Sequence, residues 1–330
     1  MVRECIIART GEIKGLEIRE YEMSFFSKQE QLQGVSEYWG DSKQLIDNIR
    51  DAEILIVHLA PVTKDVIDAG ANLKLIGCCR GGPVNVDVAY ATKEGIPVIH
   101  TPGRNAHAVA DLTIGLIIAE ARGIARAHAF MKSGIWSIPE VGVELWGKTL
   151  GIIGLGNVGS LVAFRAKNGF NMNVLAYDPY VEKKRARELG VKLVDLETLL
   201  HESDFVTVHA RAPPDAKPMI TAEHIALMKP TAYLINTSRG NLIDERALYE
   251  ALKNDKIKGA ALDVYSKEPI DPDNPLLKLD NITLTPHVGG LTLEVPLRAA
   301  EIIAEDVTSF LKSERLKNIE NPEVFKKLQT

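Results

Sequence analysis

The sequence predicts an α/β protein with two parallel-sheet domains. Short apolar runs alternate with helix-like segments along the chain, which is typical of parallel strands joined by crossover helices. One of these runs ends in a glycine-rich turn, residues 154–159, and a helix-competent segment follows at once. The length of 330 residues is enough for two domains, and 45% hydrophobic with 25% charged residues is an ordinary globular composition.

The first hundred residues contain the elements of one such domain. An apolar run at residues 5–8 is predicted to be a strand, and residues 11–40 show no clear period. Asp41 is predicted to cap a helix that ends at Arg50, and Thr63 a helix that ends at Ala69. The remaining expected elements are strands at residues 54–57, 73–78 and 97–100 and a helix at residues 86–93.

Residues 101–104 resemble a crossing between domains, and residues 105–131 are predicted to form one long helix. Its inner stretch is almost wholly apolar, so it is expected to be buried as a shared spine or a dimer face. Strands are expected at residues 150–153, 173–177, 205–208, 233–236, 260–264 and 282–284, and a closing helix at residues 291–311. A second domain, residues 105–290, is therefore predicted to be inserted into the first, residues 1–104 and 291–330.

The glycine turn predicts a dinucleotide site. Gly154 suits a tight turn, Gly156 lets the backbone approach a pyrophosphate, and Gly159 lets the helix pack on the strand. The phosphates would lie on free N–H groups at the helix N-terminus. These N–H groups belong to Asn157 and Val158. Asp178 ends the next apolar run, where an acid can hold both hydroxyls of an adenine ribose and repels a 2′-phosphate, so NAD is the expected cofactor.

Composition narrows the class of protein. A formal net charge of −5 with scattered Lys and Arg argues against a nucleic-acid partner. The three cysteines, Cys5, Cys78 and Cys79, have no metal-ligand spacing, so no metal site is expected and the thiols should be reduced. The N-terminus lacks a signal-peptide pattern, and no run is long enough to span a membrane. We expect a soluble cytoplasmic protein.

Three motifs after the glycine turn supply candidate catalytic residues. Arg239 ends residues 235–239 (INTSR), and its planar fork suits a carboxylate or a 2-keto acid. Glu268 and His287 follow the next two expected strands, so all three are expected on one rim of the sheet. His287 is the natural acid and base, because only histidine titrates near neutrality unperturbed. A carboxylate beside it would fix its tautomer and raise its pKa.

Each of these residues could instead have a structural role. A lone histidine after a strand, a Glu-Pro turn or an Arg-Gly loop is more often structural than catalytic, and only their joint occurrence favours a site. Arg80 and Gly81 also follow an expected strand, where open α/β sheets bind ligands, but this segment could be a plain turn. The histidines without such a setting are expected to be non-catalytic: His58, His107, His201 and His209.

The motifs GLGNVG with Asp178, NTSRG, ALDVYSKEP and TPHVGG, in this order, resemble the D-isomer-specific 2-hydroxyacid dehydrogenases. The resemblance covers nearly the whole chain and includes the loop RGGPVNVD. It implies two Rossmann-like domains, the NAD-binding one inserted, and a homodimer formed through that domain. It also implies an NAD-dependent oxidoreductase that interconverts small 2-hydroxy and 2-keto acids.

The resemblance further implies a role for each site residue. Arg239 would hold the carbonyl and carboxylate of the substrate, Glu268 would support His287, and His287 would donate or accept the proton. The backbone at Arg80 and Gly81 would bind the substrate carboxylate. The remaining implied cofactor contacts are Ala210, Thr237, Ser238, Asp263 at the nicotinamide carboxamide, Gly289 and Gly290.

The phosphoglycerate dehydrogenase-like subgroup is similar across the cofactor half, so D-3-phosphoglycerate dehydrogenase of serine biosynthesis is one alternative. His58 and Cys78 stand where that subgroup tends to carry arginines for a phosphorylated substrate, and Arg80 where it tends to have glycine. The phosphate is therefore left open. A second alternative is a non-catalytic NAD-sensing protein, because the family resembles transcriptional corepressors that have the same dehydrogenase fold. No appended regulatory domain is expected.

Overall fold

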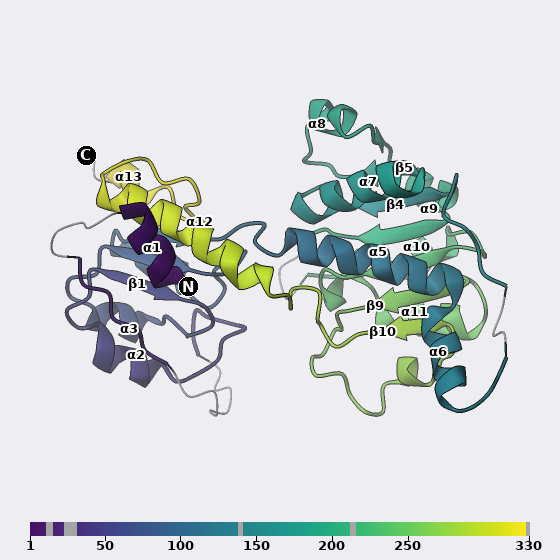
Figure 1. Cartoon of the computed structure of the whole chain (residues 1–330), viewed down its shortest axis with the longest axis horizontal. Helices are drawn as coiled ribbons and strands as arrows, with labels where there is room; N and C mark the ends of the chain where they lie inside the picture. Colours follow the sequence, from purple (N-terminus) through teal and green to yellow (C-terminus); the bar gives the residue numbers. More distant parts are fainter. Residues whose placement is uncertain (11–15, 23–31, 138–140, 212–215, 328–330) are drawn as a thin grey trace. The chain divides into compact units, whose positions relative to one another are not determined.

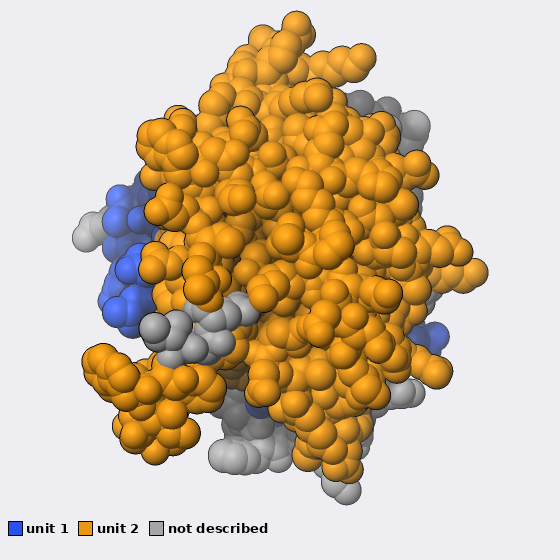
Figure 2. Space-filling view, turned by 90° about the vertical axis from the view of Figure 1, so that its right-hand side faces the viewer, with its two compact units in different colours: residues 1–105, 292–330 blue, residues 106–291 orange. Residues whose placement is uncertain are grey.

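Two compact α/β units make up the protein, which we describe from a computed structural model (Figures 1 and 2). The structure describes residues 1–10, 16–22, 32–137, 141–211 and 216–327. Unit 1 comprises Met1–Asn105 and Thr292–Thr330, and unit 2 comprises Ala106–Leu291. Figure 2 shows unit 1 in blue and unit 2 in orange. The predicted fold class, parallel sheets with the second domain inserted into the first, is confirmed.

Unit 1 is built on a three-stranded parallel sheet in the order β1 (Ile54–Val57), β2 (Leu75–Cys78), β3 (Val98–His100). One face of this sheet packs with α2 (Ser42–Ile49), α3 (Lys64–Ala69) and α4 (Val88–Lys93). The other face packs with α1 (Val2–Thr10) and α12 (Glu294–Leu311), and the short α13 (Val324–Lys327) follows (Figure 1). Because successive strand residues point to opposite faces, Leu75 and Ile76 enter different cores.

The strand predicted at residues 5–8 is wrong, because these residues lie in α1. A short apolar run cannot be assigned to strand or helix by periodicity alone, and tertiary packing decides. Here Ile6 is buried with Leu75 and Ile303, so the segment covers the sheet and does not extend it. The helix predicted after Asp41 is confirmed, with the Asp41 side chain accepting from the Lys43 N–H at 2.9 Å.

Unit 2 contains a seven-stranded parallel sheet in the order β10-β9-β8-β7-β4-β5-β6. The strands are β4 (Thr149–Ile153), β5 (Asn173–Tyr177), β6 (Lys192–Leu193), β7 (Phe205–Val208), β8 (Tyr233–Asn236), β9 (Gly259–Leu262) and β10 (Ile282–Leu284). The chain moves outward from β4 in one direction and then returns to continue from β7 in the other. The carboxyl ends of β4 and β7 therefore form the switch point at which open parallel sheets bind ligands.

Helices cover both faces of this sheet. One core contains α5 (Ala106–Arg122), α7 (Asn157–Phe170) and α8 (Lys183–Glu188). The other contains α9 (Leu196–Glu202), α10 (Ala222–Ala226) and α11 (Glu245–Lys253). Two 3₁₀ turns complete the unit, η1 (Gly240–Leu242) and η2 (Pro275–Lys278). Within the described ranges, no helix combines the length and the apolar character that crossing a bilayer requires.

The long helix predicted at residues 105–131 is instead two helices. α5 ends at Arg122, Gly123 adopts a left-handed backbone with φ +60°, and α6 (Ile124–Lys132) starts in a new direction. Glycine is the residue that takes this conformation without steric cost. Only α5 is buried as predicted, whereas α6 buries no residue completely.

Candidate active site

The glycine turn joins β4 to α7 at the switch point of the unit 2 sheet. Gly154 has φ +95°, and a Cβ on it would lie 2.7 Å from the N atom of Ala210. A Cβ on Gly159 would lie 2.1 Å from the Gly154 carbonyl oxygen. Neither position can therefore carry a side chain. At Gly156, by contrast, a Cβ would meet nothing within 4 Å among the described residues, so space is open beside it.

This turn fits the pyrophosphate of a dinucleotide. α7 begins at Asn157, and Gly156 before it provides no side chain that could cap the helix. The first N–H groups of a helix have no partner within the helix and carry its positive dipole end. An anion that occupies the space beside Gly156 would meet the N–H groups of Asn157 and Val158.

Asp178 lies against this turn, at the end of β5. Its Oδ2 accepts from the Leu155 N–H at 2.8 Å, and its Oδ1 accepts from the N–H groups of Tyr180 at 2.9 Å and Val181 at 3.1 Å. A carboxylate has about four accepting positions, and backbone groups use three of them. The side chain is thus fixed beside the glycine turn, and it keeps accepting capacity for a donor from outside the protein.

The loop after β8 carries Arg239 and is held by Asn236, which is 1% exposed. The Asn236 Oδ1 accepts from the Ser238 N–H at 3.0 Å, and its Nδ2 donates to the Arg239 carbonyl at 2.9 Å. A 2.8 Å hydrogen bond between the hydroxyls of Thr237 and Thr113 ties the loop to α5. The Arg239 side chain is exposed, and its Nη1 donates to the Ser238 carbonyl at 2.9 Å.

Asp263 connects the loop after β9 to the loop after β10. It is 1% exposed, and it accepts from the Thr285 hydroxyl at 2.6 Å and from the N–H groups of Val288 and Gly289 at 2.8 Å each. Its carboxylate therefore organises the loop that carries His287. Sequence reasoning missed Asn236 and Thr285 as supporting residues, although both lie inside motifs that it singled out.

His287 and Glu268 form a hydrogen-bonded pair at this edge. The His287 Nδ1 lies 2.6 Å from the Glu268 Oε2, and the Glu268 Oε1 accepts from the Tyr265 N–H at 3.0 Å. The imidazole is half-exposed, and His287 has a left-handed backbone with φ +53°. Because Glu268 engages Nδ1, Nε2 is the ring nitrogen available to exchange a proton with a ligand.

The pair shifts both pKa values in opposite directions. The hydrogen bond to Glu268 raises the pKa of His287 above its ordinary 6.5, although burial opposes this. Burial acts to raise the pKa of Glu268, but the hydrogen bonds from His287 and from the Tyr265 N–H outweigh it and hold that pKa below 4.5. The positive charge of Arg239 lowers both pKa values, which means that it lies close to the pair.

The structure therefore brings Arg239, Glu268 and His287 together, each after one of the neighbouring strands β8, β9 and β10. A Cβ on Gly240 would lie 1.9 Å from the Tyr265 carbonyl carbon, so the loops after β8 and β9 touch through their backbones. This arrangement can bind an anion with a guanidinium and exchange a proton with it through an imidazole.

Arg80 and Gly81 lie in unit 1, at the carboxyl end of β2. The Arg80 carbonyl accepts from the Thr101 N–H at 2.8 Å, and the Gly81 carbonyl lies 3.2 Å from the His100 Nδ1. The Arg80 guanidinium forms an ion pair with Glu37 and donates to the Glu37 carbonyl at 2.5 Å. The loop is therefore fixed to β3 on one side and to the segment around Glu37 on the other.

The fold and the site define a two-domain α/β protein whose inserted unit is built to bind a dinucleotide. Residues 114–289 match the family described as "D-isomer specific 2-hydroxyacid dehydrogenase, NAD binding domain". The chain belongs to the D-isomer-specific 2-hydroxyacid dehydrogenase family, and unit 2 is its NAD-binding domain.

Relatives with different names share this similarity. The chain is 46% identical over 282 residues to the D-3-phosphoglycerate dehydrogenase of Methanocaldococcus jannaschii, covering 84% of this chain and 53% of that protein. It therefore spans about half the length of that relative. It is 41% identical over 290 residues to the glyoxylate reductase of Korarchaeum cryptofilum, covering 86% of this chain and 87% of that protein.

A solved structure shows the same likeness. The D-lactate dehydrogenase of Aquifex aeolicus, complexed with NAD and lactic acid, superposes with a TM-score of 0.68 at 31% identity. The match covers 86% of this chain and 87% of that one.

The hydrogen bond between His287 and Glu268 predicts that the pKa of His287 depends on the charge of Glu268. Replacing Glu268→Gln removes the partner charge, so we expect the pKa of His287 to fall toward 6.5 or below it, as burial and Arg239 then act unopposed by that carboxylate. The measurement is an NMR titration of the ¹³C-labelled imidazole. Glu245→Gln is the control, because Glu245 hydrogen-bonds Ser266 and Asn274 in the same region without contacting His287. An equal shift in both variants would contradict the assignment.

Proposed function

We propose that the protein is an NAD-dependent D-2-hydroxyacid dehydrogenase, which interconverts a small 2-keto acid and the D-2-hydroxy acid. The observation that carries the proposal is the 2.6 Å hydrogen bond between His287 and Glu268 at the strand ends of an NAD-binding domain. The bound nicotinamide supplies or accepts the hydride, which is the chemistry that the side chains of the protein cannot perform.

His287 is proposed as the proton donor for reduction and the proton acceptor for oxidation. Glu268 holds the Nδ1 proton, so the imidazole presents Nε2 toward the substrate oxygen and stays protonated at higher pH than a free histidine. Protonated Nε2 then donates to the carbonyl oxygen as this becomes a hydroxyl. The half-exposed ring can exchange its proton with solvent between turnovers.

Arg239 is proposed to hold the carboxylate and the carbonyl of the substrate, because a guanidinium can donate two parallel hydrogen bonds to such a group. The backbone N–H groups at Arg80 and Gly81 are proposed to bind the same carboxylate, which makes unit 1 the substrate-binding domain. The remaining proposed cofactor contacts are Ala210, Thr237, Ser238, Asp263, Gly289 and Gly290.

The proposal leaves more than one 2-keto acid as a candidate substrate. One relative is named for phosphoglycerate and another for glyoxylate, so both phosphorylated and simple acids are candidate substrates. A protein that only senses NAD needs no proton relay. The engaged pair of Glu268 and His287 therefore favours an enzyme over a sensor.

The proposal predicts NADH oxidation with at least one member of a panel of glyoxylate, pyruvate, hydroxypyruvate and phosphohydroxypyruvate. With that substrate, His287→Gln should lower kcat by about 10²- to 10⁴-fold, the usual contribution of a general acid. Binding of NADH, measured by fluorescence titration, should be nearly unchanged. The control is His201→Gln, because His201 is exposed on α9.

The same assay, run at different pH values, tests the role of His287 in each direction of the reaction. Reduction uses the protonated imidazole, so its rate should fall as pH rises through the raised pKa of His287. Oxidation uses the neutral imidazole and should lose rate as pH falls through that value. NADH binding with no turnover of any acid in the panel would support the sensor, and full activity of His287→Gln would remove this residue from the mechanism.

Asp178 is proposed to set the preference for NADH over NADPH. Asp178→Asn keeps the size of the side chain and one oxygen acceptor but removes the charge that opposes a 2′-phosphate. We expect the ratio of kcat/KM for NADH to that for NADPH to fall about 10- to 100-fold, as a charge-assisted hydrogen bond would give. Glu182→Gln, an exposed site ahead of α8, makes the same charge change and should leave the ratio unaltered.

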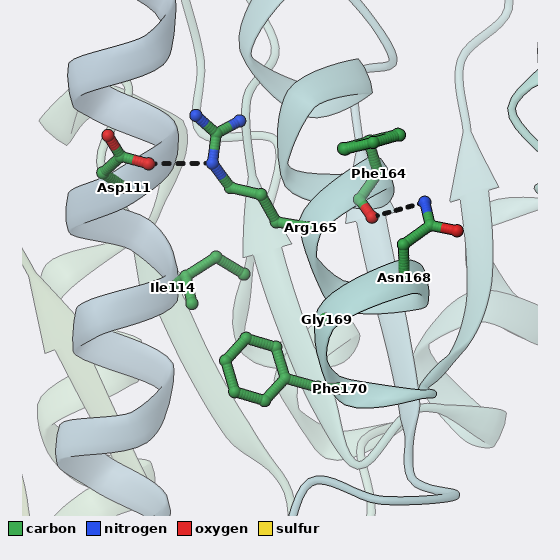
Figure 3. Close-up of a pocket in the computed structure, with 7 residues that line it drawn as sticks. All are labelled: Asp111, Ile114, Phe164, Arg165, Asn168, Gly169 and Phe170. Atoms are coloured by element: carbon green, nitrogen blue, oxygen red, sulfur yellow. Dashed lines mark hydrogen bonds and ion pairs between the residues drawn. The ribbon is translucent and has the colours of Figure 1, made fainter.

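A homodimer through unit 2 is also proposed. A pocket of about 430 Å³ lies between α5 and α7 (Figure 3). It is lined by Asp111, Ile114, Phe164, Arg165, Asn168, Gly169 and Phe170, and a 2.8 Å ion pair between Asp111 and Arg165 crosses its rim (Figure 3). A second pocket of about 490 Å³ contains Ile118, one helical turn after Ile114. Phe164, which lines the first pocket, is 58% exposed, as an interface residue of a separated subunit would be.

The proposed dimer predicts that a charge placed in the first pocket lowers the molecular mass of the protein in solution, because the dimer dissociates. The wild type should sediment as a dimer, and Phe164→Asp should sediment as a monomer, because burial of an unpaired carboxylate opposes association. Leu277→Asp, which places the same charge on the exposed part of η2, should stay dimeric. A monomeric wild type in analytical ultracentrifugation would contradict the proposal.

A cytoplasmic location is proposed as well. Cys5, Cys78 and Cys79 are free thiols in the structure, which is the usual state in a reducing compartment.

A further inference from the structure

A group of cationic and polar side chains lies at the carboxyl edge of the unit 1 sheet. His58 follows β1, Arg80 follows β2, and Arg104 follows β3. Because the three strands are parallel, these residues come to the same edge. The loops are tied together by the hydrogen bond from the Thr101 N–H to the Arg80 carbonyl at 2.8 Å.

The two arginines of this edge differ in their partners. Arg80 is paired with Glu37. Arg104 has no ion-pair partner within the described ranges, and its Nε is buried without a hydrogen bond there. The Arg104 carbonyl accepts from the Arg298 Nη1 at 3.0 Å, so its neighbours include further cations. A half-buried guanidinium that lacks a carboxylate is unfavourable in the free protein and calls for an anion from outside.

Titratable neighbours do not neutralise Arg104. Burial, with the charges of Arg104 and Arg80, lowers the pKa of His58 to about 4, so this imidazole is neutral at neutral pH. Burial raises the pKa of Cys78 to about 11 and that of Cys79 to about 12, so both are thiols and not thiolates. Burial and the nearby Arg80 also lower the pKa of Arg104, which still remains a cation.

Unit 1 contains buried polar atoms without a hydrogen-bond partner in the part of the chain that the structure describes. Among the described residues, those without a partner are the Tyr38 hydroxyl, the Thr101 hydroxyl and the Arg104 Nε, and all three belong to unit 1. Thr101 lies in the loop of Arg104 and is 0% exposed. Tyr38 follows Glu37, the partner of Arg80. Buried polar atoms are normally hydrogen-bonded, so the unpaired Thr101 hydroxyl and Arg104 Nε, which belong to one loop, mark a place where a polar ligand can complete the bonding.

We propose that Arg104, with the Thr101 hydroxyl and His58, binds a second acidic group of the substrate, distinct from its 2-keto carboxylate. The substrate is then a 2-keto or 2-hydroxy acid that carries another carboxylate or a phosphate ester. This inference rests on the proposed function, in which Arg239 and the backbone at Arg80 and Gly81 already hold the first carboxylate. Carboxylate and phosphate both accept the planar fork of a guanidinium, so the experiment must separate them.

The test compares Arg104→Met with wild type on two kinds of substrate. Glyoxylate and pyruvate carry one acidic group, whereas oxaloacetate carries a second carboxylate and phosphohydroxypyruvate a phosphate. We expect KM for at least one of the two doubly acidic substrates to rise about 10- to 100-fold, the contribution of a charge-assisted hydrogen bond, with kcat nearly unchanged. The acid that responds identifies the second group. KM for glyoxylate and pyruvate should stay within a factor of about two.

Two further variants control the experiment. Arg50→Met removes an exposed positive charge from the same unit and should change none of these constants. Arg104→Lys keeps the charge without the fork and should restore part of the lost affinity. An equal rise in KM for all four acids would overturn the proposal, because Arg104 would then serve the first carboxylate or the fold. Unchanged KM values for the doubly acidic substrates would overturn it as well.

A binding measurement separates this inference from the proposed function. If wild type turns over neither of the two doubly acidic substrates, the anion site is judged by thermal shift with inorganic phosphate and malonate against sodium chloride of equal ionic strength. The dehydrogenase proposal itself fails only if wild type turns over none of these four acids and no hydroxypyruvate. Stabilisation of wild type and Arg50→Met by either anion, reduced in both Arg104→Met and Arg104→Lys, supports the site. Equal shifts in all four proteins, or none in wild type, overturn it.

Discussion

Parallel pairing of the strands is the constraint on which the rest of this protein depends. Every strand pair of both sheets is parallel, so the chain must cross back between paired strands, in most cases along a helix, and each carboxyl end reaches the same edge of its sheet. In unit 2 this edge collects Arg239, Glu268 and His287 from separate loops. It also places Gly154 beside Ala210 at the switch point. Residues far apart in sequence become neighbours through one rule of sheet topology.

Buried hydrogen-bond acceptors fix the positions of the loops that parallel pairing brings together. Asp263 is almost completely buried, and a buried carboxylate is tolerated only when hydrogen bonds satisfy it. Its three donors all come from the loop that carries His287. This loop holds His287 at a positive φ, which an unsupported non-glycine residue avoids. The orientation of the imidazole is therefore a consequence of Asp263 and Glu268 together.

The parts of this arrangement that the sequence predicts are the local ones. The glycine turn was predictable because backbone sterics act within a few residues, and the strands were predictable because buried apolar runs end in turn residues. The strand at residues 5–8 and the unbroken helix at residues 105–131 were wrong, because packing of Ile6 and the left-handed Gly123 decide those segments. The three backbone bonds to Asp178 depend on contacts that spacing does not encode. The roles of the site residues stay predictions.

Overall similarity does not determine which acid is the substrate in the proposed reaction. The chain has comparable identity to a D-3-phosphoglycerate dehydrogenase and to a glyoxylate reductase, and only the first of these relatives is named for a phosphorylated acid. The groups proposed to perform the reaction, Arg239, Glu268 and His287, address only the part that all 2-hydroxy acids share. Discrimination must then come from groups that meet the remainder of the substrate, and their charge is the strongest available signal. A half-buried arginine without a carboxylate partner, such as Arg104, lowers the stability of the free protein unless a ligand supplies the missing negative charge.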